Sequence, residues 1–106
     1  MARYLWQASY TSEGVKGVQS AGGSSRRDAI QQLVDSLGGK LECFYFAFGD
    51  DDVYVVAELP DNSTAAAVAM VVNASGAVRL KTTVLLTPEE VDAAGQKSVD
   101  YRPPGG

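Results

Sequence analysis

Residues 40–59 read KLECFYFAFGDDDVYVVAEL and decide the fold of this chain. Aromatic side chains are concentrated in residues 40–48, and β-branched side chains are frequent in residues 53–59. The GDDD sequence at residues 49–52 separates the two segments and is typical of a hairpin turn. Pro60 ends the second segment because proline has no N–H group to donate to a sheet. The stretch therefore predicts two antiparallel strands joined by a hairpin.

The segment before the hairpin predicts a helix that begins near Ser24. Ser25 and Asp28 have the spacing of a capping box, and the apolar residues that follow recur at the spacing of one helical face. Gly38 ends this helix, because glycine adopts the left-handed backbone conformation without a steric penalty. Residues 15–23 are rich in glycine, which opposes a long helix, so we expect a brief helix followed by a loop.

The outer segments predict one more helix and two more strands. Alanines over residues 64–74 give high helix propensity, and Asn62 or Ser63 is expected to cap that helix. Bulky and polar residues alternate over residues 3–10 and 78–86, which is typical of strands with two unlike faces. The resulting order along the chain is strand, helix, strand, strand, helix, strand.

The C-terminal part of the chain predicts a short helix and a tail. Thr87 is a favourable cap, Pro88 fits the first helical position, and Gly95 interrupts the helix. The segment that follows has little to bury, so we expect it to be loose. We therefore predict one domain over residues 1–94 and a flexible tail over residues 95–106.

This order of elements predicts the α+β class with a ferredoxin-like βαββαβ arrangement. A four-stranded antiparallel sheet then carries both helices on one face, and its other face has no cover within the chain. The residues expected on this uncovered face are Tyr54, Val56, Glu58, Arg79, Lys81 and Thr83. Such a face is more apolar than monomers usually expose, so we expect a homodimer or a higher oligomer.

The composition of the chain limits which partners it can bind and which catalytic and metal-binding groups it can use. The 106 residues carry a net charge of -4, which disfavours binding to nucleic acids and to anionic membranes. No segment has the apolar length of a signal peptide or a membrane span, and Cys43 is the only cysteine, so a cytoplasmic protein is expected. The chain has no histidine, which is the commonest general base and metal ligand. We therefore expect no metal and no cofactor.

Three segments together resemble the GYD domain family. They are YTSEG at residues 10–14, FYFAFGDDDV at residues 44–53, and GAVR at residues 76–79 leading to TPEE at residues 87–90. The resemblance implies a bacterial protein of the dimeric α/β-barrel type, in which two ferredoxin-like sheets pair face to face, and it implies no particular reaction. The Gly-Tyr-Asp signature of the family falls on Gly49 and Asp52, with Asp50 and Asp51 where the tyrosine stands.

Four residues form the candidate ligand-binding site: Trp6, Tyr54, Glu58 and Arg79. Tyr54 and Glu58 would offer polar groups to a small, partly apolar metabolite. Arg79 would anchor an anionic group of that metabolite, and Trp6 would form a wall. Under this hypothesis the protein is a binding protein or a cofactor-free enzyme, with its cavity at the sheet face or a subunit interface.

The alternative hypothesis is a non-catalytic module for self-assembly or protein interaction. Glu58 would then form cross-strand ion pairs with Arg79 or Lys81 inside an interface. Trp6 would be part of the core, as aromatic residues of a central strand usually are. The sequence identifies no catalytic residue for either hypothesis.

Three further features have a structural and a functional interpretation. Cys43 is either a nucleophile or a small buried hydrophobic residue. The aspartates at residues 50–52 either bind a divalent cation or form a solvated turn. The GGSSRR sequence at residues 22–27 either binds an anion or forms a loop and a helix cap. We expect the structural interpretation in each case.

Overall fold

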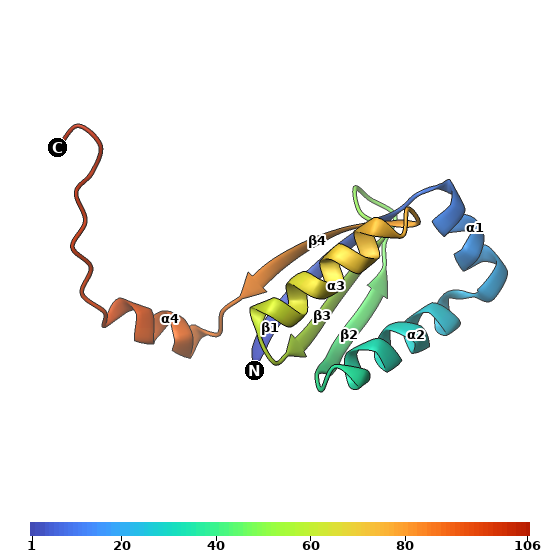
Figure 1. Cartoon of the computed structure of the whole chain (residues 1–106), viewed down its shortest axis with the longest axis horizontal. Helices are drawn as coiled ribbons and strands as arrows, with labels where there is room; N and C mark the ends of the chain where they lie inside the picture. The colour runs from blue at the N-terminus through green and yellow to red at the C-terminus, as the bar shows by residue number, and fades with distance from the viewer.

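Four strands form one antiparallel sheet in the computed structural model, which describes residues 1–106 (Figure 1). The strands are β1 (Ala2–Tyr10), β2 (Lys40–Phe46), β3 (Val53–Leu59) and β4 (Val78–Leu85), and they lie in the order β2-β3-β1-β4. The hairpin joins β2 to β3, and the first and last strands pair with each other. This arrangement confirms the predicted α+β, ferredoxin-like fold.

The chain has four helices: α1 (Ser12–Ala21), α2 (Gly23–Ser36), α3 (Asn62–Ala74) and α4 (Pro88–Gly95). One face of the sheet is covered by helices. α2 lies against β2, and α3 lies against β3 and β4 (Figure 1). The two longer helices therefore rest on opposite halves of the same face, which we call the covered face. The other face, which no helix covers, is called the open face.

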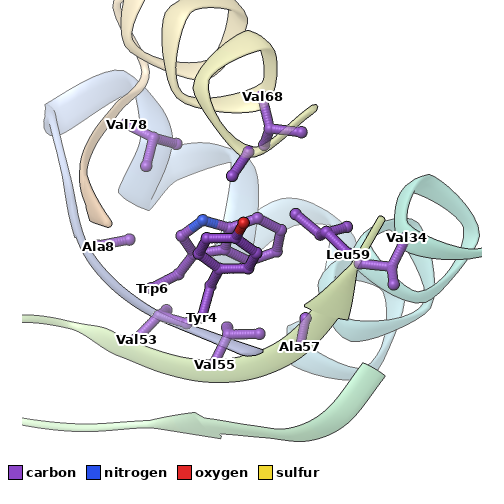
Figure 2. Close-up of a cluster of buried hydrophobic side chains, with 11 residues drawn as sticks. Tyr4, Trp6, Ala8, Val34, Val53, Val55, Ala57, Leu59, Val68 and Val78 are labelled. Atoms are coloured by element: carbon purple, nitrogen blue, oxygen red, sulfur yellow. The ribbon is translucent and has the colours of Figure 1, made fainter. Parts of the chain in front are cut away.

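The covered face holds the hydrophobic core, because alternate residues of a strand point to the same side of a sheet. Figure 2 shows Tyr4 and Trp6 of β1 at the centre of this cluster, between side chains of β3 and of the helices. The Tyr4 hydroxyl donates a hydrogen bond to Asn62 Oδ1, so this buried ring has a polar partner. The buried core residues are Tyr4, Trp6, Ala8, Val34, Val53, Val55, Ala57, Leu59, Ala65, Val68 and Val78.

Helix α1 corrects the sequence prediction of a brief helix and a loop over residues 15–23. It has ten residues, and Thr11 caps it by accepting a hydrogen bond from the Gly14 N–H group through its side chain. A Cβ atom at Gly14 would collide with the carbonyl oxygen of Ala77, so this glycine permits close packing. Gly22, with a φ of 94°, separates α1 from α2. The glycines therefore shape the helix pair and do not prevent the first helix.

Two predicted helix caps are also wrong. α2 begins before Ser25 and has no side-chain cap, so there is no capping box at that residue. α3 is capped by Asp61 and not by the predicted Asn62 or Ser63, and hydrogen bonds from Thr64 lower the pKa of the Asp61 carboxyl group. The predicted cap of α4 at Thr87 is confirmed, with both hydrogen bonds of a capping box.

The C-terminal segment extends away from the sheet. Figure 1 shows α4 and residues 96–106 projecting beyond the end of β4. The radius of gyration is 16.8 Å, whereas a compact chain of this length has about 13 Å. Val91, Val99 and Tyr101 of this segment are exposed. The predicted flexibility of residues 95–106 stays a prediction. None of the helices has the length and hydrophobicity required to cross a membrane.

Candidate functional site

The open face carries rows of side chains that cross the sheet from β2 to β4. The strand register defines three rows of four residues: Lys40, Glu58, Arg3 and Leu85; then Cys43, Val56, Leu5 and Thr83; then Tyr45, Tyr54, Gln7 and Lys81. Ser9 and Arg79 form the next, shorter row. Leu5 and Val56 are half-buried at the centre of the face. The face therefore has an apolar centre with polar groups at both ends.

Asp51 organises one end of the open face. Its carboxylate accepts hydrogen bonds from Gln7 Nε2 at 3.3 Å, Ser9 Oγ at 3.0 Å and Lys81 Nζ at 3.0 Å. The Lys81 hydrogen bond and charge, with help from Ser9, lower the pKa of Asp51. The prediction of a solvated turn is wrong for this aspartate, which is only 5% exposed. No local pattern predicts this role, because its partners lie on β1 and β4.

Asp52 stabilises the hairpin turn, and Cys43 lies on the open face. Asp52 Oδ2 accepts a hydrogen bond from the Tyr10 N–H group, and the Asp52 N–H group donates to the carbonyl oxygen of Ala8. These bonds tie the hairpin turn to the end of β1. Cys43 lies half-buried in the central row of the open face.

A second charged cluster lies at the opposite end of the face. Arg3 forms ion pairs with Glu42 at 2.9 Å and with Glu58 at 3.5 Å. A register irregularity in β2 between Leu41 and Cys43 accompanies the position of Glu42. Hydrogen bonding and charge from Glu42 raise the pKa of Arg3. The carboxylate of Glu58 is therefore already engaged within the chain.

Arg79 differs from these groups because it takes part in none of the four ion pairs. It borders a polar hollow of about 390 Å³ at the edge of β4, together with Ser9, Asp51, Asn73, Leu80 and Lys81. The Asn73 side chain exchanges two hydrogen bonds with the backbone of Leu80 and so covers part of this strand edge. An exposed guanidinium beside such a hollow is suited to an anionic group.

The structure does not bring the four predicted site residues together. Tyr54, Glu58 and Arg79 lie on the open face, as predicted, but Trp6 lies in the core on the covered face. β1 separates Glu58 from β4, and the register places Glu58 level with Leu85, six residues along from Arg79. At about 3.4 Å per residue, these two side chains are roughly 20 Å apart. Within one chain, Glu58 therefore does not pair with Arg79 or Lys81: it pairs with Arg3, and Lys81 pairs with Asp51.

Comparison with known protein families identifies the family of this chain. The sequence matches the GYD domain over residues 4–94. The chain belongs to the GYD domain family. This confirms the resemblance drawn from the hairpin and its flanking segments. Neither the curated proteins nor the solved structures include a match to this chain.

Proposed function

We propose that this GYD domain protein is a homodimeric binding protein whose two copies pair through their open sheet faces. A small, partly apolar metabolite with an anionic group binds between them. The observation that carries this proposal is the apolar centre of the open face, which no part of the same chain covers. Leu5 and Val56 lie side by side there, and Tyr54 borders them.

The chain buries little surface by itself. Only 12 of its 106 residues are buried, and a similar number of large hydrophobic residues are exposed, among them Tyr45 of the open face. Small domains bury a limited fraction of their surface, so association with a second copy is a common source of additional stability. Sheet-to-sheet packing is one way to bury half of a strand's side chains, because two faces interdigitate about 10 Å apart.

The charged ends of the open face suit both parts of the proposal. Glu58 is paired with Arg3 and Asp51 with Lys81, so each of these carboxylates enters an interface with a cationic partner from its own chain. Arg79 has no such partner and is left to bind the anion. The hollow of about 390 Å³ beside it has the volume of a small-molecule site. We propose binding instead of catalysis because Glu58 and Arg79 of the candidate site lie too far apart to act on one bond.

The association is tested by sedimentation equilibrium on three proteins. The wild type is expected at twice the 11.2 kDa mass of the chain. Val56→Asp places an unpaired charge at the centre of the open face and is expected to yield a folded monomer. Met70→Asp makes the same kind of change on α3, where Met70 is 73% exposed, and should leave the dimer intact. A wild-type monomer, or a Val56→Asp dimer as tight as wild type, contradicts the proposal.

The ligand is tested by native mass spectrometry of the purified protein beside a denatured control. A discrete extra mass on the dimer that disappears on denaturation, and that Arg79→Gln loses, supports a bound anion at this face. Lys97→Gln is a control that removes a positive charge elsewhere on the surface. An extra mass retained by Arg79→Gln contradicts the role of this arginine.

A second function, a non-catalytic assembly module, is favoured by one observation. The two charged clusters are satisfied within the chain and therefore do not require a ligand. A dimer that carries no extra mass and whose stability does not change on Arg79→Gln indicates this function.

A further inference from the structure

The core contains one buried side-chain donor without an acceptor. Trp6 is 3% exposed, and its Nε1–H group has no hydrogen-bond partner. Buried indole N–H groups usually have one, since an unpaired buried donor is costly. Tyr4, two residues earlier on the same face, has such a partner in Asn62. The unpaired group of Trp6 is therefore an exception within this core.

The Trp6 ring borders a cavity of about 40 Å³ between the sheet and helices α2 and α3. Figure 2 shows its ring nitrogen on the side nearer Ala8 and Val78, and both of these residues line the cavity. Eleven of its twelve lining residues are hydrophobic, and the other is Arg26. The space admits a small group such as a carbonyl or a single water molecule. The cavity thus offers one donor within apolar walls.

A groove of about 490 Å³ lies next to this cavity, at the surface between α1, α2 and α3. Arg26, Val72 and Val78 line both spaces, so the groove and the cavity adjoin at these three side chains. The volume of the groove lies in the range of small-molecule sites. Gly17 of α1 lines the groove, and a Cβ atom there would meet nothing within 4 Å. The groove is therefore open where α1 faces it.

Few polar side chains line the groove, and they differ in charge. Arg26 is half-buried and takes part in none of the four ion pairs. Burial raises the pKa of Tyr10, although the nearby Arg26 opposes this change, so its hydroxyl stays protonated and is available as a donor. Ser25 and Ser75 add hydroxyl groups. Glu13 is the one carboxylate in the lining and repels anions from its part of the groove.

From these observations we infer a binding site within each chain for a small apolar carbonyl compound that carries an anionic group. The apolar body lies in the groove, the carbonyl oxygen accepts the hydrogen bond of Trp6 Nε1, and the anion binds Arg26. This inference goes beyond the proposed function, because the site lies on the covered face and is complete without a second copy.

The probe for this site is 6-acetyl-2-naphthoate, which has an apolar body, a ketone and a carboxylate. Two analogues each lack one group: 6-ethyl-2-naphthoate has no ketone, and 2,6-diacetylnaphthalene has no charge. Trp6 is the only tryptophan, so quenching of its fluorescence reports binding beside its ring. We expect saturable quenching by the full probe and an affinity about five- to tenfold weaker for each analogue.

Two variants assign these losses to residues. In Trp6→Phe, measured by calorimetry, the ketone should no longer improve affinity, because the donor is gone. In Arg26→Gln, the carboxylate should no longer improve affinity. The matched control is Arg27→Gln, since the adjacent Arg27 is exposed, pairs with Asp28 and does not line the groove. Its affinities should equal those of the wild type.

A third variant separates loss of binding from loss of folding. Gly17→Leu places a side chain in the groove and replaces a helical glycine by a better helix former. It is expected to lose the probe at least tenfold while its thermal unfolding temperature does not fall.

The inference is overturned if the probe does not quench Trp6 at saturation, which would assign the cavity to a single water molecule. It is also overturned if the ketone contributes equally in wild type and Trp6→Phe. Val56→Asp, the monomeric variant of the open face, must bind the probe like the wild type. Loss of the probe in that variant would show that the site depends on the dimer, whereas failure of the dimer alone leaves this site intact.

Discussion

The two faces of the sheet are built from the same strands, but their side chains have different surroundings. On the covered face, Leu59 and its neighbours are sealed by α2 and α3, and polar atoms are rare. On the open face, charged residues pair across strands at both ends, and Leu5 and Val56 between them are only half-buried. The covered face therefore determines whether the chain folds, and the open face determines what the folded chain contacts.

The largest expected effect on stability comes from a comparison of one leucine on each face. Leu59→Ala removes a fully buried side chain and should lower the free energy of unfolding by about 3 kcal/mol. Leu5→Ala on the open face should cost about 1 kcal/mol or less in dilute solution, because Leu5 is partly exposed there. Urea denaturation at two protein concentrations measures both.

The concentration dependence sharpens this comparison. The cost of Leu59→Ala should be the same at both concentrations, whereas the cost of Leu5→Ala should grow when the dimer forms. If the cost of Leu5→Ala is also the same at both concentrations, the open face is not an interface.

The next effect compares two tyrosines. Tyr4→Phe removes the hydroxyl that bonds to Asn62 and should lower the free energy of unfolding by about 1 kcal/mol. Tyr54→Phe removes a hydroxyl from the open face, where no hydrogen bond of that group is present, and should change stability little. Thermal unfolding of both variants tests the difference. A larger loss for Tyr54→Phe would show that its hydroxyl has a partner in the dimer.

The fold followed from the sequence because its determinants are local. The alternation in residues 53–59 and the GDDD turn at residues 49–52 specify a hairpin without reference to the rest of the chain. Gly38 and Thr87 end and begin helices through their own backbone and side-chain chemistry. α1 was mispredicted because its Gly14 permits close contact with Ala77, which is distant in the sequence, and composition does not reveal such a contact.

The candidate site was predictable only in part, because it depends on strand order. Alternation placed Tyr54, Glu58 and Arg79 on one face, but β1 between β3 and β4 keeps the last two apart. Asp51 is a central group whose partners are at least thirty residues away along the chain. Trp6 is on the other face, and its unpaired N–H group is a property of packing that no motif encodes.

The third prediction concerns the acid sensitivity of the open face. The pKa of Asp51 is lower in the folded protein than in the unfolded chain, so its contribution to stability is present above about pH 4 and is lost as the pH falls through the folded value. Urea midpoints of wild type and Asp51→Asn, measured at pH 7, 4 and 3, should therefore converge in acid. Asp61, whose pKa is also lowered, is present in both proteins and cancels in the comparison.

A gap between these two proteins that is as large at pH 3 as at pH 7 would contradict the assignment. The difference between wild type and Asp51→Asn would then come from packing in the turn and not from the charge of the carboxylate. Lys81→Met is the matched variant, since it removes the other partner of the ion pair and should show the same convergence.

The smallest effect is expected outside both faces, in α4. Thr87→Ala removes one half of the capping box, in which Thr87 Oγ1 accepts from the Glu90 N–H group and Glu90 Oε1 accepts from the Thr87 N–H group. A lost cap destabilises a helix by about 1 kcal/mol, so amide exchange within α4 should be about fivefold faster. The unfolding temperature of the whole protein should not change, because α4 projects away from the sheet (Figure 1). A fall as large as that of Tyr4→Phe would mean that α4 packs against a second copy, which would extend the contact beyond the open face to the C-terminal segment.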